Sequence, residues 1–181
     1  MSTPISHLSE ISACSDAVAW VKESKSESLE AAWLACQRGD WMLWYAGKKA
    51  GPVGDEKRKR LVLAACECAR LALPVWEKRY PDDKRVRECI ETAEKWARNE
   101  ATLEALQVSR RNCYAADYAD AAAAADAADY ADAAAVAAAV AVAAAVAAAA
   151  VAAYACAAYA YAATLKKCAD IVRKHYPTLP T

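Results

Sequence analysis

The segment that most constrains this chain runs from Ala101 to Tyr176, because it contains neither glycine nor proline. As one helix it would be about 110 Å long at 1.5 Å per residue. A compact domain of the 181 residues in this chain has a radius of gyration of only about 16 Å. The segment therefore forms a rod or folds back on itself. Aspartates cluster near its middle and are better N-caps than interior helix residues. We predict a turn at about residues 125–133, with Asp129 or Asp132 starting the next helix.

Residues 133–163 carry no charge and consist mostly of alanine. A membrane span needs about 20 strongly apolar residues, and this tract has no Leu, Ile or Phe. Disorder is disfavoured because alanine is the strongest helix former. An ice-binding helix would repeat threonine on one face, and the tract contains none. Packed helix is the interpretation that remains, so we expect 101–176 to form an Ala-rich helical hairpin followed by a tail, 177–181.

Larger side chains in this segment fall on two arcs of a helix. At 100° per residue one set lies within an arc of about 80°, and Val142 and Val146 lie on a second arc. Two apolar arcs predict neighbours on more than one side, and an exposed apolar strip of this length is typical of an interface. We therefore expect self-association into a homodimer or higher homo-oligomer, with Val136, Val140 and Tyr154 among the contacts. The first arc holds Val136, Val140, Val151, Tyr154, Tyr161 and Leu165.

Glycine, proline and capping residues divide the rest of the chain into helices. No segment alternates as a strand does, so the sequence predicts an all-α fold, a single bundle-like domain over residues 1–181 with a Trp-rich half, 1–100. The expected helices run from a Ser28 cap to Gly39, from an Asp40 cap to Gly47, from Asp55 with a kink or restart at Pro74, from Asp82 or Asp83, and from Thr102. Their predicted core stripes are Leu29, Ala32, Trp33 and Cys36; Leu61, Ala65, Cys68 and Leu71/Ala72; and Val86, Cys89, Ile90, Ala93, Trp96 and Ala97.

Composition excludes several classes of partner. Lys plus Arg equals Asp plus Glu at 23 each, so no net field attracts DNA or an anionic membrane. The first ten residues lack the pattern of a signal peptide, and we expect a cytoplasmic location, in the host if the chain is phage-encoded. Eight cysteines are then expected to be reduced and packed as small apolar groups. Cys66 and Cys68 point to nearly opposite sides of a helix and cannot share a metal.

Catalytic motifs are missing from the sequence. His7 and His175 lie near the two ends, and no nucleotide-binding, zinc-protease or serine-hydrolase motif occurs. Asp126, Asp129 and Asp132 could place two carboxylates on one face for a metal, but a solvated stripe with a cap is the favoured interpretation. We therefore expect no enzyme activity, no cofactor and no metal.

Two groups of residues are candidates for binding. Trp41, Trp44 and Tyr45 could form an aromatic platform for a base or a partner side chain, although a plug for the core is favoured. Cations could receive phosphates or acidic side chains, although a solvated helix face is the default. These cations are Arg58 and Arg60 within the run Lys57–Arg60, together with Arg110 and Arg111.

Residues 61–176 resemble the Imm5-like family, all-helical predicted immunity proteins of bacterial toxin systems with relatives in phage genomes. The elements that carry the resemblance are Leu73-Pro74, Tyr80-Pro81-Asp82, Arg85-x-Arg87, Ile90, Trp96 and the Ala-rich tract, and "RGDWMLWYAG" resembles the phage-type members. Asn99-Glu100 stands where the family tends to have Gly-Glu, and asparagine is the next best residue in the left-handed conformation that ends a helix. Relatives often carry His within the tract, whereas this chain has none there.

The resemblance implies a binding protein. The immunity function of the family is itself assigned from gene neighbourhood. We therefore expect a non-enzymatic protein that sequesters a toxin or an immune effector. A phage counter-defence sponge for a nucleotide immune signal is the alternative, with Trp41 or Trp44 stacking on the base and Arg58, Arg60 or Arg110 holding phosphate. A structural Ala-rich rod is the third possibility.

Overall fold

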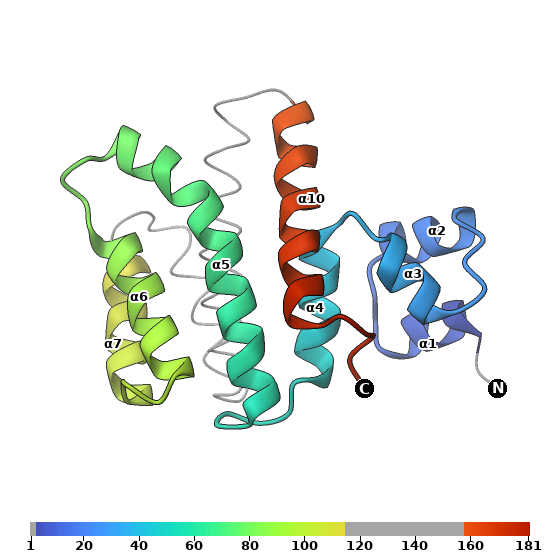
Figure 1. The fold of residues 1–181 in the computed structure, drawn as a ribbon, viewed down its shortest axis with the longest axis horizontal. Helices are drawn as coiled ribbons and strands as arrows, with labels where there is room; N and C mark the ends of the chain where they lie inside the picture. Colours follow the sequence, from blue (N-terminus) through green and yellow to red (C-terminus); the bar gives the residue numbers. More distant parts are fainter. Residues whose placement is uncertain (1–2, 115–157) are drawn as a thin grey trace.

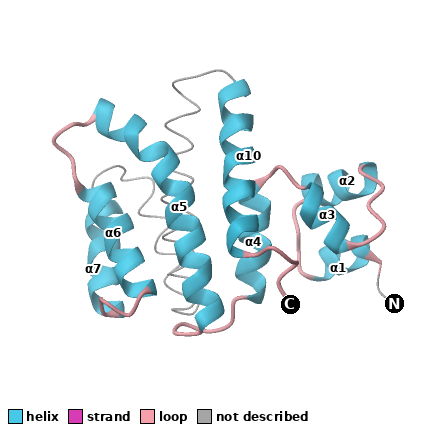
Figure 2. Cartoon of the chain, in the orientation of Figure 1, coloured by secondary structure: helices cyan, strands magenta, loops and turns pink. Residues whose placement is uncertain are grey.

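The computed structural model describes residues 3–114 and 158–181, and every described element is a helix. The predicted all-α class is confirmed, since these residues contain no strand (Figure 2). The predicted turn near 125–133, the Asp126/Asp129/Asp132 cluster and the self-association residues lie outside the described residues. The helices are α1 (Pro4–Glu10), α2 (Ser15–Glu23), α3 (Leu29–Ala35), α4 (Gly39–Lys49), α5 (Glu56–Arg79), α6 (Arg85–Ala97), α7 (Leu103–Tyr114) and α10 (Ala158–His175).

The helices are arranged in a row along the long axis of the molecule. Figure 1 shows α6 and α7 at one end, α5 next to them, then α10 with α4, and α1–α3 at the other end. The C-terminal tail runs from α10 toward the α1–α3 end (Figure 1). Helix α5 is therefore the central element, because it contacts α6 on one side and both α4 and α10 on the other.

Each side of α5 belongs to a different apolar cluster. Leu61, Ala65 and Cys68 pack with α3, α4 and α10, whereas Val62 and Cys66 pack with α6 and α7. The Cys66 and Cys68 thiols thus lie on opposite sides, as the sequence predicts. Each thiol donates to a carbonyl of the cluster that it faces, Cys66 to Ile90 O and Cys68 to Cys168 O, both at 3.8 Å. Burial raises the pKa of the Cys66 thiol to about 12.

Three predicted N-caps are confirmed by their hydrogen bonds. The Ala31 N–H donates to Ser28 Oγ at 3.1 Å, the Lys57 N–H to Asp55 Oδ1 at 2.7 Å, and the Ala105 N–H to Thr102 Oγ1 at 3.1 Å. Each bond satisfies one of the backbone donors that a helix start leaves unpaired. The cap predicted at Asp82 or Asp83 is wrong, because the N-cap of α6 is Lys84, although Asp83 Oδ1 accepts from the Arg85 N–H at 3.1 Å.

Some predicted helix ends are wrong. Helix α3 ends at Ala35 because Cys36 is extended, and α4 begins at Gly39. Asp40 is therefore not an N-cap but lies in the first turn of α4, where its carboxylate pairs with Arg38. Gly47 does not stop α4, which continues to Lys49.

Helix α5 follows one of the two alternatives predicted at Pro74, a kink, and departs from its predicted core stripe at Leu71. Pro74 does not restart the helix, which is continuous to Arg79, and Figure 1 shows it bending toward its C-terminal end. A proline interrupts the hydrogen-bond ladder and bends a helix in this way. Leu71 is exposed rather than part of the core stripe, and Ala72 takes the buried position.

Helix α10 confirms part of the packed-helix prediction for the C-terminal half. Its buried residues Leu165, Cys168, Ala169 and Val172 recur at helical spacing. They face α4 and α5. Small residues at this crossing, such as Gly39 of α4, allow the two helices to approach closely.

Asn99 ends α6 in the left-handed conformation that the sequence predicts. Its φ is 63°, and the Glu100 N–H donates to Lys95 O at 2.8 Å across the helix end. A side chain with a Cβ costs about 1–2 kcal/mol in this conformation, and asparagine less than most. We expect Asn99→Ala to lower the free energy of unfolding by about 1 kcal/mol and Asn99→Gly to raise it. Urea denaturation of the two variants checks this, and a gain in stability from alanine would contradict it.

Candidate functional site

An apolar pocket lies between α1, α2, α3, α4 and the C-terminal tail. Its volume is about 70 Å³, and Trp44 is the member of its lining that is exposed, at 36%. It brings together the three aromatic candidates of the sequence, Trp41, Trp44 and Tyr45, with Trp20 and Trp33. The complete lining is Leu8, Ala13, Ala17, Trp20, Val21, Leu29, Ala32, Trp33, Cys36, Trp41, Met42, Trp44, Tyr45 and Leu179.

Tilted pairs of aromatic rings form its walls. The Trp20 and Trp41 ring centroids are 6.1 Å apart at 58°, and those of Trp33 and Tyr45 are 6.0 Å apart at 54°. Such tilted contacts are among the favourable geometries of aromatic pairs. Within the segment Trp41–Tyr45, Met42 and Leu43 are buried in the core, while Trp44 reaches the surface.

Cations surround these aromatic side chains. The Arg38 guanidinium carbon lies 4.1 Å from the Trp41 ring, and Lys48 Nζ lies 5.2 Å from the Trp44 ring. Lys49 Nζ lies 5.9 Å from the Tyr45 ring. Arg38 is already paired with Asp40, at 2.6 Å. Lys48 and Lys49 form no ion pair with any residue of the described ranges, so they leave positive charge next to the apolar pocket.

The arginine candidates of the sequence do not line this pocket. Arg58 is buried and donates to Gly51 O from Nε at 3.0 Å and from Nη2 at 2.5 Å, so it holds the loop ahead of α5. Burial lowers the pKa of this guanidinium. The Arg60 guanidinium carbon lies 5.8 Å from the Tyr176 ring. Arg110 is buried and Arg111 exposed, both on α7, which packs against α6.

The sequence missed α1 and α2 and therefore missed Trp20 as a wall of the pocket. A signal for α1 is present, because Pro4 follows Thr3 and Thr3 Oγ1 accepts from the Ser6 N–H at 3.2 Å. Proline at the first position after a capping threonine is typical of a helix start. Trp33 was predicted as core only, since nothing in the sequence indicates that a pocket forms beside it.

Hydrogen bonds at the end of α10 attach the pocket to the rest of the molecule. Trp33 Nε1 donates to Tyr176 O at 3.1 Å, and Arg173 Nη1 donates to Cys36 O at 2.6 Å. Tyr176 is itself anchored, because its hydroxyl donates to Lys57 O at 2.8 Å and burial raises its pKa to about 12. The position of α3, and with it one wall of the pocket, therefore depends on the C-terminal residues.

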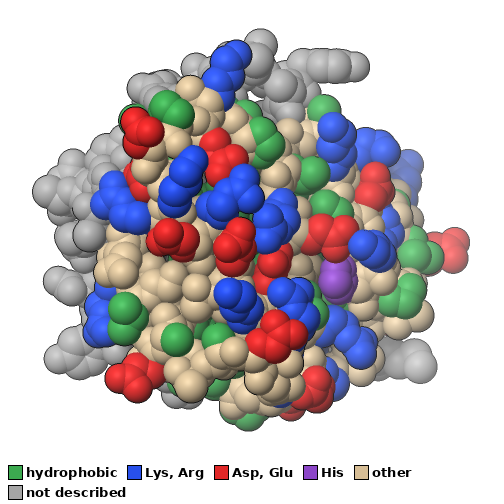
Figure 3. Space-filling view, turned by 60° about the vertical axis from the view of Figure 1, so that its left-hand side comes forward, with side chains coloured by type: hydrophobic (Ala, Val, Ile, Leu, Met, Phe, Trp, Pro, Cys, Tyr) green, Lys and Arg blue, Asp and Glu red, His purple; other side chains and the backbone are tan. Residues whose placement is uncertain are grey.

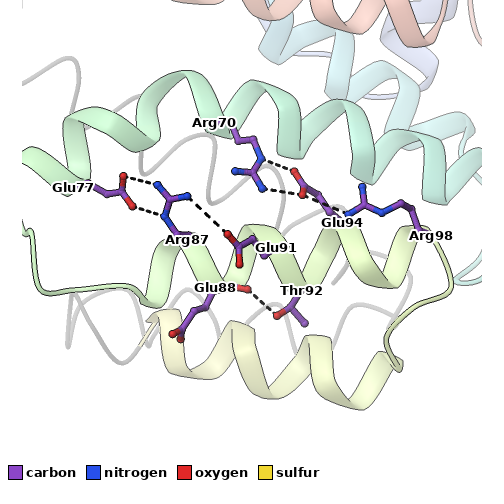
Figure 4. Close-up of polar contacts among 8 residues, drawn as sticks. All are labelled: Arg70, Glu77, Arg87, Glu88, Glu91, Thr92, Glu94 and Arg98. Atoms are coloured by element: carbon purple, nitrogen blue, oxygen red, sulfur yellow. Dashed lines mark hydrogen bonds and ion pairs between the residues drawn. The ribbon is translucent and has the colours of Figure 1, made fainter.

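A second polar feature is a network of ion pairs between α5 and α6. Figure 4 shows side chains from the two helices pointing toward one another. Arg70 donates to Glu94 at 2.6 and 2.9 Å, and Arg87 donates to Glu77 at 2.6 and 2.8 Å. On this side of the molecule positive and negative side chains are interleaved (Figure 3). Because the charges satisfy one another, the network holds α5 against α6 and presents no patch of one sign.

The paired carboxylates of this network, together with Glu67 between α5 and α10, predict a loss of stability in acid. The pKa of Glu94 is lowered by its bonds to Arg70, and the pKa of Glu67 by bonds from Lys174 and His175. A carboxylate with a pKa below its ordinary value of 4.5 contributes stability that is fully present above that pH and is lost as the pH falls through the lowered pKa. We therefore expect the free energy of unfolding to fall steadily below about pH 4.5.

Glu94→Gln tests the origin of this acid sensitivity. The Glu94 side chain is only 16% exposed, so the variant should lose about 1 kcal/mol at pH 7 and show a weaker dependence on pH below 4.5. Glu100→Gln is the matched control, since that side chain is 57% exposed and 3.6 Å from Arg98. Urea denaturation at pH 7 and at pH 3.5 checks both. An unchanged acid response in Glu94→Gln would show that this network is not its source.

Other site classes receive no support within the ranges described. Residues 3–114 and 158–181 contain no cluster of His, Cys, Asp or Glu that could hold a metal, and none of their helices is long and apolar enough to span a bilayer. The cysteines of these ranges form no disulfide with one another, and five of them are buried as predicted. The buried thiols are Cys36, Cys66, Cys68, Cys89 and Cys168, Cys113 is half-buried and Cys14 exposed.

Comparison with known families gives one match. The model of immunity protein Imm5 matches residues 45–170, from the middle of α4 into α10. Comparison with curated proteins and with solved structures gives no match. Of the residues that line the pocket, only Tyr45 falls inside the matched segment. Because the match covers more than two thirds of the 181 residues, the chain belongs to the Imm5 family of immunity proteins.

Proposed function

We propose that this protein is a non-enzymatic immunity protein that neutralises a protein toxin, or a comparable immune effector, by binding it. The family supplies the immunity role. The observation that supports direct binding is the aromatic pocket, which has an exposed tryptophan and, beside it, two lysines that pair with no carboxylate of the described residues. Partly exposed tryptophans next to a pocket are typical of the residues that dominate protein interfaces.

The same geometry favours a protein partner over a nucleotide. The pocket is almost purely apolar, and Arg58, which the nucleotide hypothesis assigns to phosphate, donates instead to Gly51 O. A nucleotide site needs donors for phosphate next to the stacking surface. Lys48 and Lys49 supply charge near the rim, but the pocket walls offer the base nothing to pair with.

Co-expression with a protein toxin, taken from the neighbourhood of the gene for this chain where one is encoded there, tests the proposal. We expect cells to survive the toxin only with this protein present, and the two proteins to elute together in size-exclusion chromatography. A panel of cyclic nucleotides should leave the melting temperature unchanged, because only a ligand that binds the folded state raises it. A rise with one nucleotide, together with no protection from the toxin, would favour the sponge hypothesis.

Self-association through the Ala-rich tract, residues 133–163, stays a prediction of the sequence, as do a cytoplasmic location and the single-domain organisation. The variant Val140→Glu places a charge on the predicted apolar strip, where an unpaired charge is costly to bury. Light scattering of the wild-type chain should show a dimer or larger species that this variant loses. A wild-type monomer at high concentration would contradict the prediction.

A further inference from the structure

We infer that the pocket between α1–α4 receives a branched aliphatic side chain from an acidic segment of the partner protein. This inference rests on the proposed function, and it specifies the surface and the partner chemistry that the function would use. Three features of the described residues lead to it: the size of the pocket, the charge beside it, and its place outside the segment that matches the family.

The volume of the pocket indicates which kind of side chain it can take. The pocket holds about 70 Å³ and its walls are apolar. An enclosed apolar cavity of about 150 Å³ takes up benzene, so this pocket is too small to enclose an aromatic ring or a nucleobase. A leucine, isoleucine or valine side chain is smaller and makes full contact with such walls. Its burial removes apolar surface from water on both partners.

The positive charge beside the pocket indicates which residues of the partner should flank that side chain. Lys48 and Lys49 extend from the last turns of α4 over the Trp44 and Tyr45 rings, with no carboxylate of the described residues paired to them. Arg38 covers the Trp41 ring but already holds Asp40. Acidic residues next to the inserted side chain would therefore meet two lysines at the rim. Complementary charge of this kind speeds association and orients the partner.

The pocket lies almost entirely outside the segment that matches the family model. The residues that line it come from α1–α4 and from Leu179, and only Tyr45 lies within residues 45–170. The matched segment contains α5–α7 and most of α10, which form the frame of the molecule. Recognition at the pocket would therefore use residues other than those that give the family match.

A peptide probe tests the inference on the intact protein. The probe is an N-acetylated, C-amidated Asp-Glu-Leu-Glu-Asp peptide, compared with the same peptide carrying Ala for Leu and with one carrying Lys for all four acids. Binding is followed by tryptophan fluorescence and by shifts of the indole N–H signals. We expect the leucine peptide to bind at least about tenfold more tightly than either comparison peptide.

Two variants on α2 show whether the peptide occupies the pocket. Ala17 lines the pocket and Ala19 is exposed on the same helix, so Ala17→Leu fills the pocket from within and Ala19→Leu is the matched control. We expect Ala17→Leu to keep the wild-type melting temperature and to bind the leucine peptide at least about tenfold more weakly. Ala19→Leu should bind as the wild type does. Lys48→Glu with Lys49→Glu should shift the preference toward the lysine peptide.

The inference is overturned if Ala17→Leu, shown by its melting temperature to be folded, binds the leucine peptide as tightly as the wild type. It is also overturned if the leucine and alanine peptides bind equally, or if none of the peptides binds. If Ala17→Leu still neutralises a toxin that the wild-type chain neutralises, the inference that the pocket binds the partner is wrong and the immunity function stands. If the leucine peptide binds as expected but the chain protects against no toxin, the proposed function fails instead.

Discussion

Replacing Gly39 with valine should lower the free energy of unfolding by about 3 kcal/mol or more, a large fraction of the stability of a typical domain. Gly39 begins α4 where this helix crosses α10. A Cβ at this position would meet the Cys168 Cβ and would lie 2.7 Å from both Ala169 N and the Cys168 carbonyl carbon. Two of these three atoms are backbone, so no side-chain rotation relieves the overlap and the two helices must separate.

Gly47, in the same helix, is the matched control. Among the described residues, a Cβ there would meet Leu61 Cδ2, at an ordinary 3.7 Å. Gly47→Ala should therefore raise the free energy of unfolding by about 0.5–1 kcal/mol, because alanine loses less conformational freedom in a helix than glycine does. Urea denaturation of both variants measures the contrast. A Gly39→Val protein as stable as the wild type would show that α4 and α10 are not in close contact.

Trp33→Ala should have the second large effect, a loss of about 3–5 kcal/mol. The Trp33 side chain is only 4% exposed, packs on the Tyr45 ring and donates its indole N–H to Tyr176 O. Its removal leaves a cavity beside the pocket and an unpaired carbonyl at the end of α10. Trp33→Phe keeps most of the ring but not the donor, so it should fall between the wild type and Trp33→Ala.

Leu34→Ala is the control for this prediction, since Leu34 is the next residue of α3 and is 61% exposed. Its effect on the free energy of unfolding should stay within about 0.5 kcal/mol. Thermal denaturation followed by circular dichroism separates the two cases. Equal melting temperatures for Trp33→Ala and Leu34→Ala would contradict the packing of α3 against α4 and the C-terminal residues.

Local chemistry made the helix starts predictable from the sequence. Ser28, Asp55 and Thr102 cap their helices through hydrogen bonds to backbone donors two or three residues further along, and Asn99 ends α6 through its own left-handed conformation. These interactions depend on residues close in the chain. The opposite orientations of Cys66 and Cys68 were predictable for the same reason, because helical geometry alone fixes them.

The role of Gly39 and the pocket itself could not be predicted from the sequence. Gly39 was predicted to stop a helix, whereas its neighbours across the helix crossing are Cys168 and Ala169, far along the chain. The pocket brings together residues that are far apart in the chain, Leu8 with Leu179 and Trp20 with Trp41. The sequence identified Trp41, Trp44 and Tyr45 as a pattern within one helix, but their surroundings come from three other helices and the tail.

Titration of a toxin with this protein tests the central claim, that protection comes from binding and not from a reaction. Toxin activity should fall in proportion to added protein, reach its minimum at a fixed molar ratio near one, and not change with longer incubation. Ala17→Leu should shift this endpoint to higher protein concentration, and Ala19→Leu should not. If toxin activity continues to fall with time when this protein is present at a small fraction of one molar equivalent, the protein inactivates the toxin catalytically. That result would contradict neutralisation by binding.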